Sequence, residues 1–270
     1  MTRQISTSDT ESDEAVLKDM RRDIFRMMHY SKSSHIGGCL SCLETLYALY
    51  FKVMDCALIK ARSPDRDVFI LSKGHCSAAL YVTLARAGFF PRSLLDGYYI
   101  NGGILPGHLD MSATTGVECS AGSLGHGASI GLGMAIAKER DGRGGRVYVL
   151  MGDGECNEGS VWEAVMLAAT LKQKNYTLIV DFNHLQGMGR DVIDQSNLGE
   201  RFAAFGFQVL EADGHDAAAL ASALSDRRGP LAVIARTVKG RGVSFTEDRL
   251  EWHYKSPNDE QLALALRELQ

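Results

Sequence analysis

Two polar side chains come shortly after apolar runs, at positions where they could hold a cation. Asp153 follows the run 147–151 within Gly152-Asp153-Gly154, and Asn183 follows the run 176–180. Each run has the length and β-branched content of a buried strand. Open α/β sheets bind ligands at the carboxyl ends of their strands. A carboxylate and a carboxamide there, beside glycines that let the backbone come close, suit a hard cation that holds phosphate oxygens.

The chain between Asp153 and Asn183 predicts a connection that brings them together. Segment 158–172 carries apolar residues at helical spacing, so it predicts a helix that covers the two strands. An Asp between two glycines is by itself most often a turn. The Asn at the end of the next predicted strand favours the alternative, a shared ligand site at one edge of the sheet.

Five histidines form a second group of residues that could do chemistry. They lie in loops that also contain glycine: His35, His75, His108, His126 and His253. A single histidine in a loop is usually solvated or hydrogen-bonded. Here the histidines recur in loops at the strand ends, where the Asp and the Asn also lie, so the pattern favours a functional role. Imidazole groups can donate hydrogen bonds and move protons near neutral pH.

The rest of the pattern predicts the elements that position these residues. Helices are predicted at 13–31, 43–54, 75–87, 124–138, 158–172, 216–224 and 259–269, and strands at 67–71, 147–151, 176–180, 207–210 and 231–237. Loops are predicted at 33–38, 100–121, 188–197 and 240–257. Because strands alternate with helices, we expect an α/β fold with three α/β/α layers and a mostly parallel sheet. We expect residues 13–270 to form one domain and residues 1–12 to be disordered.

Composition narrows the class of protein. The chain has 270 residues, of which 45% are hydrophobic, enough for a sizeable core. The net charge is −4 and no Lys/Arg-rich segment stands out, so we expect no nucleic-acid partner. No apolar stretch is long enough to cross a membrane, and the N-terminus lacks the order of a signal peptide. We therefore expect a cytoplasmic protein without a membrane partner.

Two of the six cysteines, Cys39 and Cys42, are closely spaced. Such a pair could be a redox pair or half of a zinc site. No second pair completes a zinc site. We therefore favour the interpretation that both cysteines are small residues packed at the start of a helix, with free thiols kept reduced by the compartment.

The sequence resembles the diphosphate-binding, N-terminal part of transketolase, in particular the separate small subunit of split transketolases. The resemblance covers residues 15–260, and its motifs are Ser34-His35-Ile36-Gly37-Gly38, Ser72-Lys73-Gly74-His75, Pro106-Gly107-His108, Gly122-Ser123-Leu124-Gly125-His126-Gly127, Gly152-Asp153-Gly154-Glu155-Cys156-Asn157-Glu158-Gly159, Asp181-Phe182-Asn183 and Glu251-Trp252-His253. The chain departs from the usual pattern at Gly187 and Met188, and at His126, where many relatives have Gln.

The resemblance implies thiamine diphosphate and Mg²⁺ as cofactors, and Ca²⁺ or Mn²⁺ could replace the magnesium. By residue, it implies metal binding by Asp153, Asn183 and the carbonyl of Leu185. It implies cofactor contacts from His75, Gly122, Leu124, Gly154, Glu158, Asn183 and His253. His35, His108 and Glu158 are the implied catalytic residues. Glu158 and Glu163 match acidic residues that the family places at a subunit interface.

The implied activity is transfer of a two-carbon ketol unit from a ketose or ketose phosphate to an aldose. The family's pyrimidine-binding domain is expected on a separate partner subunit, in an α2β2 heterotetramer that is active only when both chains are present. One alternative is a relative that uses a 2-oxo acid donor, similar to deoxyxylulose phosphate synthase or to 2-oxo-acid dehydrogenase α subunits. Another is a regulatory relative without catalysis. His35 with His108 favours a hydroxylated donor, and the intact metal-ligand set argues against a regulatory role.

Overall fold

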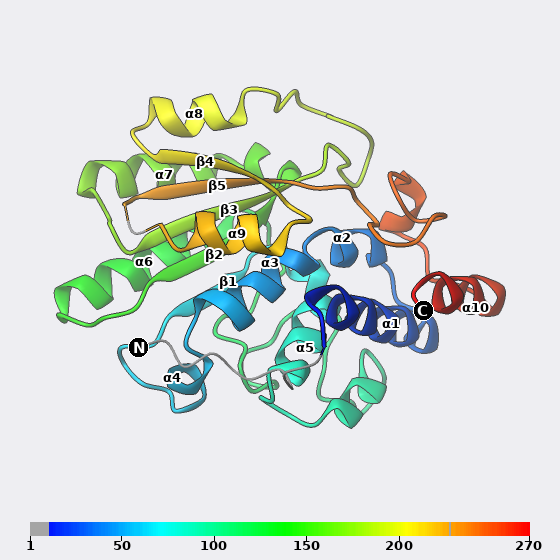
Figure 1. Ribbon diagram of the computed structural model, residues 1–270. Coiled ribbons are helices and arrows are strands. Elements are labelled where there is room, and N and C mark those ends of the chain that lie inside the picture. The colour runs from blue at the N-terminus through cyan, green and yellow to red at the C-terminus, as the bar shows by residue number, and fades with distance from the viewer. Residues whose placement is uncertain (1–10, 227) are drawn as a thin grey trace.

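The computed structural model describes residues 11–226 and 228–270 (Figure 1). Within them one sheet contains the strands β1 (Val68–Leu71), β2 (Val147–Gly152), β3 (Tyr176–Phe182), β4 (Gln208–Asp213) and β5 (Leu231–Arg236). The strand order is β1-β2-β3-β5-β4, and every neighbouring pair is parallel. The predicted strands and the parallel sheet are confirmed. Parallel sheets are covered on both faces, which is why β1, β2 and most of β3 and β5 are apolar, whereas the edge strand β4 carries polar residues.

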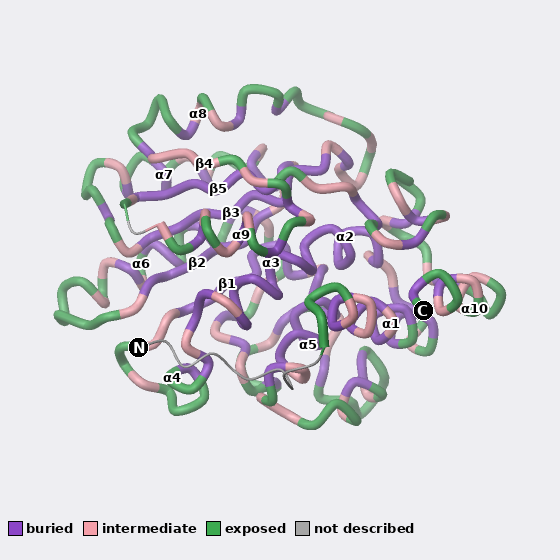
Figure 2. The backbone as a smooth tube through the Cα atoms, in the orientation of Figure 1, coloured by how far each residue is buried: buried purple, intermediate pink, exposed green. Residues whose placement is uncertain are grey.

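Helices cover both faces of the sheet (Figure 1). One face carries α1 (Asp13–Ser31), α2 (Ile36–Ser41), α3 (Leu43–Ala48), α5 (Ser77–Arg86) and α9 (Ala217–Leu224), and the other carries α6 (His126–Arg140), α7 (Gly159–Leu171) and α8 (Leu198–Ala204). Two further helices, α4 (Cys56–Lys60) and α10 (Asp259–Glu268), lie at the periphery. Figure 2 shows the buried backbone concentrated in the strands and in the helices next to them.

The strands separate two hydrophobic cores because successive side chains point to opposite faces. In β2, Tyr148 and Leu150 belong to the core under α1, α3 and α5. Val147, Val149 and Met151 belong to the core under α6 and α7. The predicted three-layer architecture is thereby confirmed.

Right-handed crossovers explain why, of the helices α7, α8 and α9 that connect the strands after β2, α9 lies on the opposite face. The chain advances along the sheet from β2 to β3 and on to β4, and α7 and α8 cover the same face. It then returns from β4 to β5, which is inserted between β3 and β4. A right-handed connection in the reverse direction places its helix on the opposite face, where α9 lies.

The predicted loop 33–38 is wrong in its second half, because Ile36 begins the helix α2. Its two glycines serve close packing. A Cβ on Gly38 would lie 2.8 Å from the Cys76 sulfur, and one on Gly37 would lie 3.3 Å from the Trp252 carbonyl oxygen. The predicted helix 43–54 is α3 followed by a π-helical turn, Leu49–Val53. The helices α4 and α8 were not predicted, because each is short.

The N-terminal prediction falls mostly on residues 1–10, which lie outside the described part of the chain. Of the rest, Ser12 caps α1 by accepting a hydrogen bond from the Ala15 N–H, and Glu11 forms an ion pair with Arg86. Cys39 and Cys42 are buried and form no disulfide, and the same holds for the other four cysteines. Across residues 11–226 and 228–270, no helix combines the length and the apolar character needed to cross a bilayer.

Candidate active site

The loops after the carboxyl ends of β1, β2 and β3 enclose a cavity of about 220 Å³. Seven of the residues predicted to bind metal or cofactor line it: His75, Leu124, Asp153, Gly154, Asn183, Leu185 and His253. They come from segments that are far apart in the sequence and that the parallel sheet brings to one edge. We call this space the strand-end cavity. The residues predicted to bind the ligands thus lie together at the carboxyl edge of the sheet.

Four of the five predicted histidines form one cluster at this cavity. The ring centroid of His35 lies 5.1 Å from that of His75, 5.1 Å from that of His253 and 6.3 Å from that of His108. A Cβ on Gly122 would lie 3.5 Å from the His108 ring, so Gly122 borders the same group. His126 begins α6 and is exposed, outside the cluster.

The backbone of His35 is held in an unusual conformation. Its φ of 78° lies in the left-handed region, which a residue with a Cβ seldom adopts. The His35 N–H donates to the carbonyl oxygen of His253 at 3.0 Å. This bond joins the start of α2 to the short 3-10 helix Leu250–His253 and fixes the two rings relative to each other.

Burial keeps the imidazoles of His35 and His253 neutral near pH 7. It lowers the pKa of His35 to about 4, and the neighbouring His75 adds to the shift. Burial and the Lys239 ammonium together lower the pKa of His253 to about 3. The Lys239 Nζ lies 2.8 Å from His253 Nδ1. An ammonium can only donate, so Nδ1 accepts and the proton of His253 is on Nε2.

The carboxylate of Asp153 is fixed by backbone amides. Its Oδ1 accepts from the Gly154 N–H at 2.6 Å, and its Oδ2 accepts from the N–H groups of Asn183 at 3.0 Å and His184 at 2.6 Å. Burial, followed by the nearby Asp181 carboxylate, raises the pKa of Asp153. A nearby cation would favour the charged form of this group.

Asn183 and Leu185 place two more oxygens beside the cavity. The Asn183 Oδ1 accepts from the Leu185 N–H at 3.0 Å, and its Nδ2 donates to Asp181 at 3.2 Å. The Leu185 carbonyl oxygen accepts from the Lys239 ammonium at 2.6 Å. A carboxylate, an amide and a carbonyl are oxygen ligands of the kind that Mg²⁺ and Ca²⁺ take. The donor set therefore fits a hard divalent cation.

A match to a known protein family decides the identity of the fold. Residues 12–269 match the family described as "Transketolase, thiamine diphosphate binding domain". The chain belongs to the transketolase family. The predicted resemblance is confirmed over nearly the whole sequence.

Relatives of similar length are named as subunits of transketolases. The chain is 40% identical over 255 residues to one subunit of the apulose-4-phosphate transketolase of Phocaeicola vulgatus, covering 92% of this chain and 90% of that protein. It is 37% identical over 242 residues to a 6-deoxy-6-sulfo-D-fructose transketolase subunit of a Clostridium species, covering 87% and 88%. Transketolase from Leishmania mexicana superposes with a TM-score of 0.86 at 28% identity, over 96% of this chain. The chain spans 41% of that structure.

Lys239 was not predicted from the sequence, although it lines the strand-end cavity of this transketolase-family chain. Burial and the charge of Lys73 lower its pKa to about 8. Burial and Lys73 thus disfavour the charged form of Lys239, and an anionic ligand in the cavity would stabilise it. The signal that could have found it is the loop 240–257, which carries His253 and begins directly after this lysine.

A buried ion pair at the wall of the cavity, to which Lys73 contributes, was also missed. Lys73 binds Asp181, and their side chains are only 3% and 0% exposed. Asp181 also accepts hydrogen bonds from Ser41 and Thr237, as well as from Asn183. The pair ties the ends of β1, β3 and β5 to α2. A charged residue inside the otherwise apolar run of β3 was the available signal.

Glu155 is a second acid that the sequence did not single out. It is 2% exposed and accepts from Ser72 and from the N–H of Gly125 at 2.9 Å. Burial raises its pKa. Glu158, which was predicted, is instead exposed at the start of α7 and outside the cavity lining, and Glu163 is exposed on the same helix.

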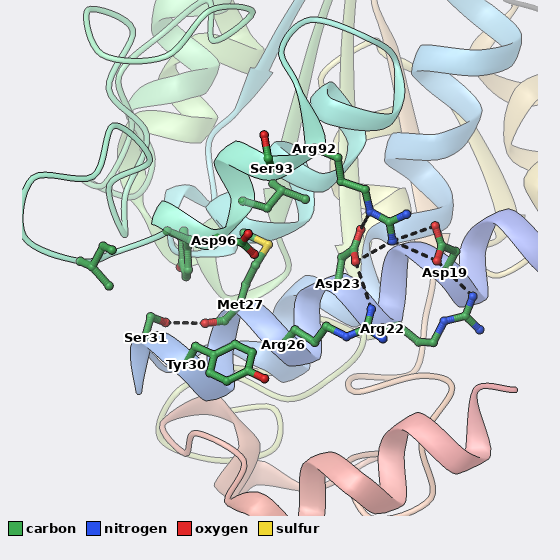
Figure 3. A pocket seen from close by; sticks show the side chains of 13 residues that line it. Asp19, Arg22, Asp23, Arg26, Met27, Tyr30, Ser31, Arg92, Ser93 and Asp96 are labelled. Atoms are coloured by element: carbon green, nitrogen blue, oxygen red, sulfur yellow. Dashed lines mark hydrogen bonds and ion pairs between the residues drawn. The ribbon is translucent and has the colours of Figure 1, made fainter.

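A separate cavity of about 610 Å³ lies between α1 and the 3-10 helix Arg92–Gly97 (Figure 3). Its charged side chains pair with one another. Arg92 binds Asp23 through Nε at 2.7 Å and also binds Asp19. Arg22 binds Asp19 at 3.0 Å and Arg26 approaches Asp23 at 3.5 Å. None of the predicted site residues lines this cavity, and its charges compensate within it, so we place the chemistry at the strand-end cavity.

Proposed function

We propose that this chain is the diphosphate-binding subunit of a two-chain transketolase that transfers a two-carbon ketol unit from a ketose or ketose phosphate to an aldose. One observation carries the proposal. The strand-end cavity combines the oxygens of Asp153, Asn183 and Leu185 with the cationic Lys239 beside the histidine cluster. Oxygen ligands for a cation next to donors for an anion match a metal-bound diphosphate.

In this proposal Asp153, Asn183 and the Leu185 carbonyl hold Mg²⁺, and Ca²⁺ or Mn²⁺ can take the same oxygens. Lys239 and the Nε2–H of His253 donate to the diphosphate, together with His75. Gly154 leaves room for the phosphate beside Asp153, and Leu124 forms an apolar wall of the cavity. When bound, thiamine diphosphate supplies the nucleophilic carbon of the transfer.

His35 and His108 are proposed to bind the hydroxyl groups of the donor sugar and to exchange protons with them. Burial and the nearby His75 lower the pKa of His108, so this imidazole is neutral near pH 7, with one N–H donor and one acceptor nitrogen. A neutral imidazole can therefore donate to one hydroxyl and accept from another. This pairing favours a hydroxylated ketose over pyruvate as donor.

A separate partner chain with a pyrimidine-binding domain is the second part of the proposal. It is supported by the relatives that are named as transketolase subunits, whose lengths this chain nearly matches. Four apolar side chains on α6 and α7 are exposed: Ile130, Met166, Leu167 and Leu171. Exposed apolar surface of this kind marks interaction sites. We propose an α2β2 assembly in which Glu158 and Glu163, at the exposed side of α7, lie at the interface between protomers.

The experiment is a reconstitution assay. The purified chain is supplied with thiamine diphosphate and Mg²⁺, with and without its partner, and donor cleavage is measured with a ketose phosphate and with pyruvate. We expect activity only in the mixture and only with the ketose. Full activity from the lone chain would refute the two-subunit proposal, and a preference for pyruvate would refute the ketol-transfer proposal.

A further inference from the structure

A chain of side-chain hydrogen bonds runs from Arg201 to the strand-end cavity. The Arg201 Nη1 donates to Gln195 Oε1 at 2.7 Å, and the Gln195 Nε2 donates to Asn157 Oδ1. The Asn157 Nδ2 then donates to Gln186 Oε1 at 3.2 Å. Gln186 is the member of this chain that lines the cavity. We call these four residues the amide relay.

Arg201 sets the direction of every bond in the amide relay. A guanidinium carries donors and no acceptor, so Gln195 must turn its oxygen toward Arg201 and its nitrogen toward Asn157. Asn157 must then accept from Gln195 and donate to Gln186. The orientation of each amide, which is otherwise ambiguous, is fixed by its neighbours. Gln195 is only 1% exposed, so water has little access to reverse the middle link.

The relay leaves Gln186 with a donor that has no acceptor. Its Nε2 is buried and finds no hydrogen-bond partner among residues 11–226 and 228–270. Buried polar atoms without partners are rare in native proteins. The Gln186 N–H donates to the Gly189 carbonyl at 2.9 Å, which holds the residue in place. A Cβ on Gly154 would lie 3.0 Å from Gln186 Cγ, so the side chain rests against the backbone next to Asp153.

We propose that Gln186 is a further cofactor-binding residue, whose Nε2 donates to an anionic oxygen of the bound diphosphate. Asn157, Gln195 and Arg201 are positioning residues that keep this amide in the donor orientation. The inference rests on the proposed function, because the acceptor is the diphosphate of that same site. Hydrogen bonds to charged acceptors are stronger than neutral ones, so a preset donor here contributes to affinity.

The first test removes the donor from the cavity. The affinity of the full chain with its partner for thiamine diphosphate is measured by calorimetry in the presence of Mg²⁺. Gln186→Met keeps the length of the side chain without the donor, and we expect binding about tenfold to a hundredfold weaker. Gln186→Glu presents only acceptors, and we expect a larger loss. Gln208→Met on β4 is the matched control and should bind as the wild type does.

The second test reverses the relay without touching the cavity. In Gln195→Glu, both oxygens are acceptors, so Asn157 would donate to Glu and present its oxygen to Gln186. Gln186 would then donate to Asn157 and turn its own oxygen toward the diphosphate. We expect a loss of affinity comparable to that of Gln186→Met. Gln195→Met only interrupts the relay, so it should weaken cofactor binding less than Gln195→Glu does. Both variants change the packing at residue 195, so the difference between them reports the orientation of the relay.

The outcomes separate this inference from the proposed function. If the wild type does not bind thiamine diphosphate, both fail. If the wild type binds and Gln186→Met binds within twofold of it, the role of Gln186 alone is refuted. If Gln195→Glu binds no more weakly than Gln195→Met, the positioning role of the relay is refuted. Urea midpoints measured on each variant confirm that the chains compared are folded.

Discussion

The buried pair Lys73–Asp181 offers the sharpest test of how the strand-end cavity is built. Both side chains are almost fully buried, at 3% and 0% exposure. Two unit charges at about 4 Å attract by about 4 kcal/mol at an effective dielectric constant of 20. Removing one partner of such a pair leaves an uncompensated buried charge and typically costs about 3–5 kcal/mol.

Removing Asp181 should lower the free energy of unfolding more than removing Lys73. In Lys73→Met, Asp181 keeps neutral donors from Ser41, Thr237 and Asn183, so we expect a loss of about 3 kcal/mol. In Asp181→Asn, the buried Lys73 ammonium loses its counter-charge and keeps only neutral acceptors, the Gly38 carbonyl at 3.3 Å and the introduced amide oxygen. We expect this variant to lose about 4 kcal/mol.

The assay is urea unfolding of the full chain at pH 7 without cofactor, for both single variants and the double variant. The double variant leaves no unpaired charge, so we expect it to lose about 2–4 kcal/mol less than the sum of the single losses. Lys255→Met, which breaks an exposed pair with Glu251 at 3.5 Å, should change stability by less than about 1 kcal/mol. Additive losses in the double variant would refute the reasoning.

Three further predictions concern the site itself. Asp153→Ala should abolish Mg²⁺-dependent retention of the cofactor, measured by calorimetry with the exposed Asp194→Ala as control, and unchanged affinity would contradict the metal assignment. His108→Ala should slow turnover of a hydroxylated donor by roughly 5- to 150-fold, the cost of one hydrogen bond in a desolvated site, while cofactor affinity stays nearly constant. His35, with its pKa at about 4 against 6.5 when unfolded, binds a proton less readily in the folded chain, so stability should fall as pH drops from about 6.5 to 4. Asn tolerates the left-handed backbone, so His35→Asn should fold, and its free energy of unfolding should fall less steeply with decreasing pH. The slope should change by less than about 1.4 kcal/mol per pH unit. The exposed control His126→Asn should leave the slope unchanged.

The site could be predicted from the sequence where its residues follow a local rule. Asp153 and Asn183 stand out because each follows a run that must be a buried strand, and parallel strands end at one edge. The histidine loops were found for the same reason. Local rules failed for α2, whose glycines suggest a loop. Only the packing of Gly38 against Cys76 shows that they serve a helix pressed against its neighbours.

The sequence by itself determined the parallel sheet, its two covered faces and the position of Asp153 and Asn183 at strand ends, because apolar periodicity and the alternation of strands with helices can be read from short segments. Tertiary structure alone decided the order of the strands and what surrounds these two residues. Lys239 reaches the Leu185 carbonyl across 54 positions of the chain, and Asn157 bonds Gln186 and Gln195 across 29 and 38 positions. The low pKa values of His35 and His253 depend on burial and on charges from other loops. Such properties arise from distances between segments, which no local pattern records.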